Sequence, residues 1–208
     1  DASLWISRDA YTFLSAFFIY PNYEQTAQRI QSRLKPPMTA DIKFRKAINA
    51  DLPQIWIIIQ QAIQRRKEEG SNQWQDGYPN PEVIQNDLDN GHGFVLTDGN
   101  TVIGYTAILI NDEPEYERIE GKWITNEDFV VFHRVAISEH HIGKGYAKKM
   151  MLNIEEYALA KNIFSIKADT NHDNEPMKNI FKKLGYVYCG QVYFRDSPRK
   201  AFEKVIPS

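Results

Sequence analysis

The sequence predicts an α/β fold in which one mixed sheet carries helices on both faces. Short apolar strand-like runs alternate with amphipathic helical patterns, in the order βααβββ and then αβαββ. The chain has 208 residues, of which 42% are hydrophobic and 25% charged, and this composition supports one sizeable core. It carries no internal repeat and no low-complexity segment. We therefore expect a single domain with an extension.

The first 37 residues differ in character from the rest of the chain and end at Pro36 and Pro37. Their second half places apolar residues at helical spacing: Tyr23, Ala27, Ile30 and Leu34. We expect residues 1–37 to form a helical N-terminal extension of unknown role, packed on the domain or on a neighbouring subunit. Met38 is a candidate native start, which would make this extension an appendage. The domain itself is assigned to residues 38–208.

The first half of the domain is predicted to hold three strands and two helices. Asp51 and Pro53 suit the first turn of the longer helix, because a short acidic side chain caps a helix and proline fits its first turn. Asp98, Gly99 and Asn100 form a hairpin turn signal between two strands. In order, these elements are a strand over 42–47, helices over 51–69 and 81–89, and strands over 94–97 and 102–110.

The second half begins with an acidic, irregular stretch that we read as solvated surface. Asn174 is expected to cap the last helix, and Gly185 to end it. In order, the elements are the acidic stretch over 111–126, a strand over 128–137, a helix over 144–161, a strand over 163–168, a helix over 174–184 and strands over 187–194 and 201–206.

Charge and cysteine content exclude several classes of protein. The chain has 25 Lys and Arg residues against 27 Asp and Glu, so it lacks the net positive charge that is typical of nucleic-acid-binding proteins. Cys189 is the only cysteine, so a disulfide framework and a cysteine-based zinc site are excluded, and a reducing cytoplasm is indicated. The apolar run over 10–20 is about half of the ~20 residues that span a bilayer. We expect a cytoplasmic protein without a metal, nucleic-acid or membrane partner.

A glycine-containing turn between a strand and a helix is the segment most suggestive of chemistry. Gly143 and Gly145 lie just before the predicted helix, among Lys144, Lys148 and Lys149. The first N–H groups of a helix have no intrahelical acceptor, and glycine lets an anion approach them. The spacing matches neither a P-loop nor a dinucleotide fingerprint. By itself the turn has two interpretations, a phosphate site or a tight structural connection.

A second block decides between these interpretations. Asn174 opens a helix that ends in Phe181-Lys182-Lys183-Leu184-Gly185-Tyr186. Together with the turn at Gly145 and Ala147, this block resembles the GNAT superfamily of acyl-CoA-dependent N-acyltransferases. The resemblance covers roughly residues 41–206 and implies a mostly antiparallel sheet, acetyl-CoA as co-substrate and an amine as acceptor, either a small molecule or a peptide. A homodimer is a further expectation.

The resemblance also implies which residues bind the coenzyme. The strand before the turn would splay from its neighbour, and Val135, Ala136 and Ile137 would hydrogen-bond the pantetheine arm. Asn174 would reach the pantetheine, and Phe181 would pack near the thioester. The pyrophosphate would lie on the N–H groups of the turn and the first helical residues: Gly143, Lys144, Gly145, Tyr146, Ala147 and Lys148.

The chain departs from the family pattern at two positions. Ile142 replaces the usual Arg or Gln at the start of the turn, which removes a polar side chain from the phosphate region. Phe181 stands where a Tyr often reprotonates the coenzyme thiolate. Water can supply that proton, because a thiol has a pKa of ~8.5, or another tyrosine can substitute: Tyr186, Tyr188 or Tyr193. The alternative reading is a non-catalytic acyl-CoA-binding or regulatory module.

Direct acyl transfer requires a neutral amine, so a base is expected. His133 lies two residues from Val135 on the same strand, near the expected carbonyl, and histidine titrates in the range suited to general base catalysis. A histidine that merely fills the sheet is the alternative interpretation, and Glu127 or Asp128 acting through water is another. Trp74 and Tyr78 are assigned to the acceptor pocket, or else they pack beneath their loop.

Overall fold

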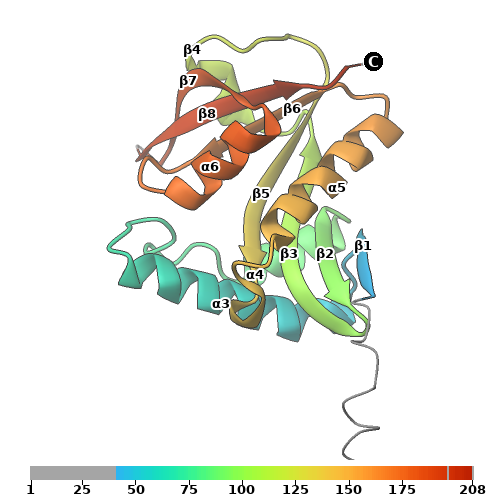
Figure 1. The fold of residues 1–208 in the computed structure, drawn as a ribbon. Helices are drawn as coiled ribbons and strands as arrows, with labels where there is room; N and C mark the ends of the chain where they lie inside the picture. Colours follow the sequence, from blue (N-terminus) through green and yellow to red (C-terminus); the bar gives the residue numbers. More distant parts are fainter. Residues whose placement is uncertain (1–40, 196, 208) are drawn as a thin grey trace, which may run out of the picture. The chain divides into compact units, whose positions relative to one another are not determined.

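The computed structural model describes residues 41–195 and 197–207, which form one compact unit. The predicted N-terminal helical extension lies outside the described residues. Eight strands form one sheet in the order β1-β2-β3-β5-β6-β8-β7-β4 (Figure 1). Every neighbouring pair is antiparallel except β5 and β6, which are parallel. The predicted mixed, mostly antiparallel sheet is confirmed.

The elements follow the predicted order. The strands are β1 Ile42–Lys46, β2 Gly93–Asp98, β3 Thr101–Ile110, β4 Glu120–Gly121, β5 Phe129–Ile137, β6 Ser165–Thr170, β7 Val187–Phe194 and β8 Ser197–Val205. The α-helices are α3 Leu52–Glu68, α4 Pro81–Asp89, α5 Tyr146–Ala160 and α6 Glu175–Leu184. Three short 3₁₀ helices are η1 Asn49–Asp51, η2 Pro114–Arg118 and η3 Glu139–His141. None of the described helices is long and apolar enough to cross a membrane.

Several element boundaries differ from the prediction, and three of these differences have a local cause. α5 begins at Tyr146 rather than residue 144, because Gly145 is in the left-handed region with φ +82°. β6 begins at Ser165 rather than residue 163, because the Ile163 amide still donates to Ala158 O and closes α5. β8 begins at Ser197, so Pro198 lies in a strand. Pro198 pairs only with β7, so its missing N–H costs no ladder bond to β6.

Helices cover both faces of the sheet, as predicted. Neighbouring residues of β2 alternate between two cores: Val95 packs with the isoleucines of α3, and Leu96 packs with α5. This alternation is the period of two that a strand buried on both faces requires. A third apolar cluster contains Tyr116 and Trp123 and packs on β5, β7 and β8. The three cores together fix the two halves of the sheet around β5.

β5 and β6 separate after three paired residues. Their register runs only from Phe129 opposite Ser165 to Val131 opposite Lys167. Beyond Val131, β5 stays paired with β3 but has an open edge on its other side. The splay inferred from the family resemblance is therefore present, and it opens the sheet in its middle (Figure 1).

Candidate acyl-coenzyme A and acceptor site

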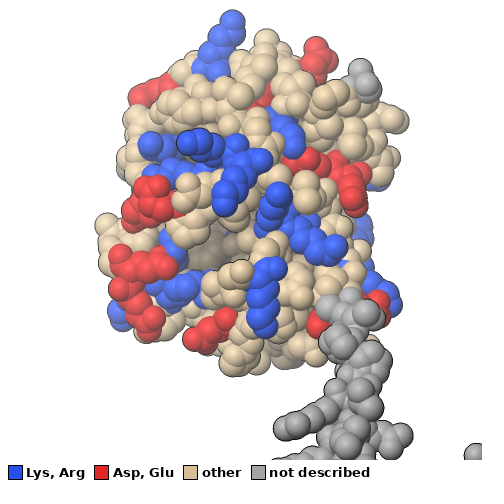
Figure 2. Space-filling model, viewed as in Figure 1, with Lys and Arg blue, Asp and Glu red and all other residues tan. Residues whose placement is uncertain are grey.

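A cleft of about 580 Å³ occupies the region where β5 leaves β6. Its walls come from α3, the loop after it, β5, the turn before α5, β6, α6 and β8. Figure 2 shows the hollow on this face, bordered by Lys and Arg side chains. The basic residues of the wall are Arg65, Arg66, Arg134, Lys148, Lys183 and Arg199. Such a cleft can receive an elongated anionic ligand.

The open edge of β5 offers unpaired backbone groups. The Ser138 amide donates to Ile103 O of β3. The backbone N–H and C=O groups of successive strand residues point to opposite sides in the plane of the sheet. Those of Ala136 therefore also face β3, opposite Tyr105, while those of Val135 and Ile137 face the open side. Val135 and Ile137 line the cleft, and Ala136 is buried among the α3 residues instead. Of the three residues assigned to the pantetheine, the structure thus brings two to the cleft.

A bulge interrupts β5 where this strand lines the cleft. His133 pairs with Ala107, and Ala136 with Tyr105, so Arg134 and Val135 both lie opposite one residue of β3. Arg134 has φ +57°, a left-handed conformation that is uncommon for a residue other than glycine. His133, Arg134 and Val135 all line the cleft. The bulge therefore places a base candidate and an arginine side by side.

The start of α5 presents unpaired amides to the same cleft. Gly143 and Gly145 have φ +76° and +82°, and an added Cβ would meet nothing within 4 Å at either position. These glycines are therefore required by backbone conformation rather than by space. The first intrahelical bond runs from the Lys149 amide to Gly145 O, so the N–H groups of residues 146–148 have no intrahelical acceptor. Among the six residues assigned to the pyrophosphate, only Lys144 is absent from the cleft wall.

α6 contributes its N-terminus to the opposite wall. The Asn174 Oδ1 accepts from the Met177 amide at 3.2 Å, which confirms the predicted cap. The Asn174 Nδ2 donates to Gln73 Oε1 at 3.1 Å, so the side chain also fastens the loop after α3. Both Asn174 and Met177 line the cleft. Asn174 thus lies in the cleft wall, and its contact with the pantetheine stays a prediction.

Phe181 does not line the cleft. Its side chain is 0% exposed, and its ring centroid lies 4.8 Å from that of Phe202 and 5.0 Å from that of Tyr186. Met177 and Ile180 of the same helix form the wall instead. Phe181 packs instead in the main apolar core, against Phe132, Tyr186 and Phe202. The expectation that Phe181 packs near the thioester is replaced by a role in the core.

The tyrosines considered as proton donors also lie outside the cleft wall. Tyr186 is buried in the core, and burial raises the pKa of its hydroxyl well above the usual value. Tyr188 is exposed, and Tyr193 donates to Glu120 at 2.8 Å on the surface. The free thiol of Cys189 is likewise absent from the wall.

His133 forms an ion-pair contact with a carboxylate that the sequence analysis assigned to the surface. Its Nε2 lies 2.7 Å from Glu113 Oε2, and the two side chains are 15% and 9% exposed. Burial raises the pKa of Glu113, while its contact with His133 opposes that shift. Glu113 is therefore part of the site, and the reading of the acidic stretch as solvated surface is wrong at this residue.

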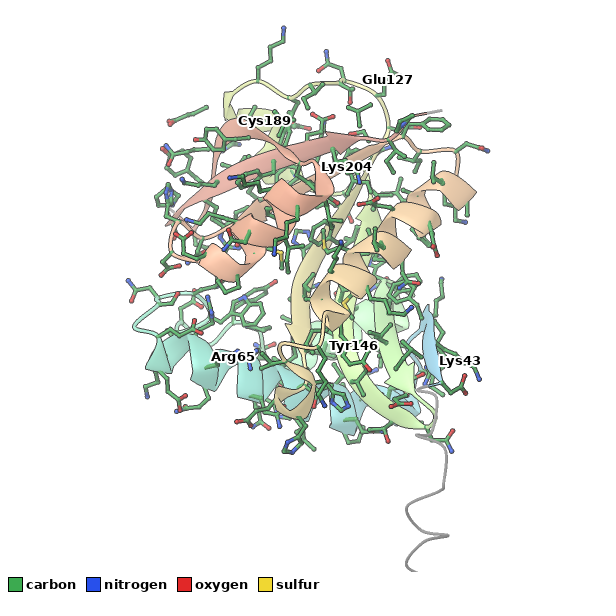
Figure 3. The ribbon with its side chains drawn as sticks, viewed as in Figure 1. Lys43, Arg65, Glu127, Tyr146, Cys189 and Lys204 are labelled. Atoms are coloured by element: carbon green, nitrogen blue, oxygen red, sulfur yellow. The ribbon has the colours of Figure 1, made fainter. Side chains whose placement is uncertain are left out.

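The other base candidates are remote from the cleft. Asp128 is exposed and accepts from Asn111 Nδ2 at 2.8 Å. Glu127 is also exposed, and Figure 3 shows it at the end of the molecule away from Tyr146. Neither residue lines the cleft. His133 is the base candidate that the structure brings to the wall.

Two buried ion pairs complete the wall. Arg134 donates through Nε and Nη2 to both oxygens of Asp87, at 3.0 and 2.6 Å, and through Nη1 to the Tyr78 hydroxyl. Tyr105 also donates to Asp87, and burial raises the pKa of this tyrosine so that its hydroxyl keeps the proton. Across the cleft, Arg199 Nη1 lies 3.2 Å from Asp169 Oδ2.

The loop over residues 70–80 forms one side of the cleft. Trp74 and Tyr78 both line it, so the structure brings the two predicted acceptor residues to the wall. Arg195 stacks on the Tyr78 ring at 4.9 Å and pairs with Asp76 at 2.9 Å. The loop therefore reaches from the α3 side of the splayed sheet to the turn between β7 and β8.

Sequence reasoning missed Glu113, Arg134, Asp87, Asp169 and Arg199. Arg134 had a detectable signal, because an arginine within an otherwise apolar strand requires a buried partner. The other four gave no local signal, since their partners are distant in the chain. Within residues 41–195 and 197–207, no group of three or more His, Cys, Asp or Glu side chains is arranged to hold a metal ion.

Comparison with known proteins identifies the family. A model described as the Acetyltransferase (GNAT) family matches residues 59–186. The chain is similar to an acetyltransferase of the GNAT family from Streptococcus agalactiae 2603, with 33% identity, a TM-score of 0.75 and coverage of 83% of this chain and 100% of that one. A search of curated proteins gave no match.

More distant structures share the fold. An acetyltransferase of the GNAT family from Listeria monocytogenes 4b F2365 has 19% identity and a TM-score of 0.65, covering 81% of this chain and 99% of that one. A ribosomal-protein-alanine N-acetyltransferase from Brucella melitensis has 18% identity and a TM-score of 0.58, covering 79% and 99%. The splayed sheet, the glycine turn before α5 and the family match lead to one conclusion: the chain belongs to the GNAT family and is an acyl-CoA-dependent acetyltransferase.

Proposed function

We propose that the protein transfers an acetyl group from acetyl-CoA to a primary amine by direct attack, with His133 as the general base. The observation that carries this proposal is the position of His133 in the wall of the cleft that also contains the open edge of β5 and the predicted acceptor residues Trp74 and Tyr78. The acceptor class is a small-molecule or peptide amine. Cytoplasmic location and a homodimer stay predictions of the sequence.

The residues of the cleft fit the co-substrate. An extended amide-bearing chain can add to the open edge of β5 through Val135 and Ile137, as a strand does. A diphosphate suits the free amides of residues 146–148 and the positive end of the α5 dipole. The Lys148 side chain adds positive charge to the same wall. Acetyl-CoA, when bound, supplies the thioester that an amine attacks.

A base matters because an amine reaches the cleft mostly protonated. A lysine-like amine has a pKa of ~10.4, so its neutral form costs roughly 4.6 kcal/mol at pH 7. An α-amine with a pKa near ~8 costs only about 1.4 kcal/mol. The imidazole of His133, held beside Glu113, can accept the proton that the amine must lose. Water can protonate the departing thiolate, since a thiol has a pKa of ~8.5.

The proposal is tested by following free thiol while the protein is incubated with acetyl-CoA and a panel of amines. The panel contains alkylamines, amino acids, peptide N-termini and polyamines at pH 7 to 8. We expect amine-dependent thiol release with at least one of these classes, above the rate without amine. Binding of coenzyme A with no thiol release across the whole panel would instead support the non-catalytic module.

A further inference from the structure

We propose that Glu113 and Glu115 form an exit route for the proton released by acetyl transfer, with Glu113 as the positioning residue that holds His133. This inference rests on the proposed role of His133 as the base. It concerns the 3₁₀ helix η2 and the residue before it, which connect β3 to β5 and carry both carboxyl groups.

The stoichiometry of the reaction requires such a route. In acetyl transfer the amine nitrogen forms a bond to the acetyl carbon, and the carbon–sulfur bond breaks. A protonated amine therefore loses two protons on becoming an amide. One proton ends on the coenzyme thiol, and the other must leave for solvent in every turnover. A base inside a cleft must pass that proton on before it can act again.

The contact of Glu113 with His133 selects the ring nitrogen that acts. Glu113 Oε2 lies 2.7 Å from His133 Nε2, and the carboxylate is 9% exposed. A carboxylate beside Nε2 favours the neutral tautomer that carries its proton there, which leaves the lone pair on Nδ1. The same carboxylate stabilises the imidazolium once Nδ1 has accepted a proton from the amine. The proton on Nε2 can then pass to Glu113, which leaves the amine's proton on Nδ1. The ring returns to its starting tautomer when water carries that proton from Nδ1 to Nε2, and Nδ1 can then act as base again.

Glu115 connects Glu113 to solvent. Burial raises the pKa of Glu113, and a side-chain hydrogen bond with Glu115 raises it further, so Glu113 can hold a proton received from His133. The same hydrogen bond lowers the pKa of Glu115, a half-buried residue, and so favours its ionised form. The pair therefore leads from the ring of His133 to a carboxylate that water can reach.

The remaining charged groups around this route are held by partners of their own. Asp169 of β6 faces Glu113 and accepts from the Tyr116 hydroxyl at 2.9 Å and from Arg199 of β8 at 3.2 Å. Arg134, beside His133 on β5, is paired with Asp87. The positive charge of Arg118 in η2 lowers the pKa of Glu115 and so favours its ionised form. Glutamine substitutions in the route leave these pairs in place.

The test compares Glu113→Gln and Glu115→Gln with Glu117→Gln, an exposed glutamate of the same 3₁₀ helix. The pH profile of kcat/KM is measured for each variant with the amine found active. We expect Glu113→Gln to lower kcat/KM at least about tenfold and to move the acidic limb to lower pH, because the imidazolium loses its carboxylate. Glu115→Gln should lower kcat, with recovery as the concentration of a small carboxylate buffer rises.

The outcomes separate the inference from the proposed function. If His133→Gln abolishes turnover but Glu113→Gln keeps the wild-type rate and acidic limb, the exit route is wrong and the base stands. If His133→Gln is fully active, both the exit route and the role of His133 as the base are wrong. If Glu113→Gln loses both rate and coenzyme A affinity, without any shift of the acidic limb, Glu113 has only a structural role. That result also overturns the route. Glu117→Gln is expected to match the wild type.

Discussion

Replacement of His133 by glutamine is expected to lower kcat/KM by about a hundredfold to ten-thousandfold, the usual contribution of a general base. The side chain lies in the cleft wall beside Glu113, so its loss removes the group that accepts the amine proton. The acidic limb of the pH profile should disappear with it. Steady-state kinetics of thiol release from acetyl-CoA over pH 6 to 9 provide the measurement.

The acceptor gives a second readout for the same variant. The loss should be larger for a lysine-like amine than for an α-amine, because deprotonation at pH 7 costs roughly 4.6 against 1.4 kcal/mol. Coenzyme A affinity should stay near the wild-type value, since the expected coenzyme contacts are backbone groups of β5 and α5. His92→Gln is a matched control, because His92 does not line the cleft. An unchanged kcat/KM and pH profile in His133→Gln would place the base elsewhere.

Replacement of Asp87 by alanine is expected to destabilise the protein by about 3–5 kcal/mol. Asp87 and Arg134 are 5% and 8% exposed, so the substitution leaves a buried guanidinium without its countercharge. It also removes the acceptor of the Tyr105 hydroxyl. Urea unfolding followed by circular dichroism gives the change in unfolding free energy.

A surface ion pair of the loop beside the cleft provides the contrast. Asp76 and Arg195 are 54% and 57% exposed, and Asp76→Asn should cost less than about 1 kcal/mol. If Asp87→Ala were as mild as Asp76→Asn, the buried network would not hold the bulge of β5. The double substitution Asp87→Leu with Arg134→Met should recover much of the lost stability, because it leaves no buried charge unpaired.

Local signals in the sequence were sufficient for most of the fold. Asn80 caps α4 by accepting from the Val83 amide, and Pro81 stands at the first helical position, so the predicted helix over 81–89 has the observed bounds. Asn174 and Gly185 similarly bound α6. These are contacts within one turn of chain, which residue types alone specify.

The candidate site was less predictable because its polar partners meet through tertiary structure. Spacing by two placed His133 and Val135 on one strand face, but the bulge at Arg134 lies between them, and its positive φ occurs without a glycine. Glu113 follows β3 in an acidic stretch that looks solvated, yet the cluster of Tyr116 and Trp123 fixes this connection against the sheet. Neither placement has a signature in the local sequence.

The central claim is that the diphosphate of coenzyme A docks on the free amides at the start of α5. Amide chemical shifts measured by NMR during a titration with coenzyme A test it most directly. The account predicts saturable changes that are largest at Gly145, Tyr146, Ala147 and Lys148, with smaller changes at Val135 and Ile137. Absence of shifts at millimolar coenzyme A, or large shifts confined to another face of the protein, would contradict it.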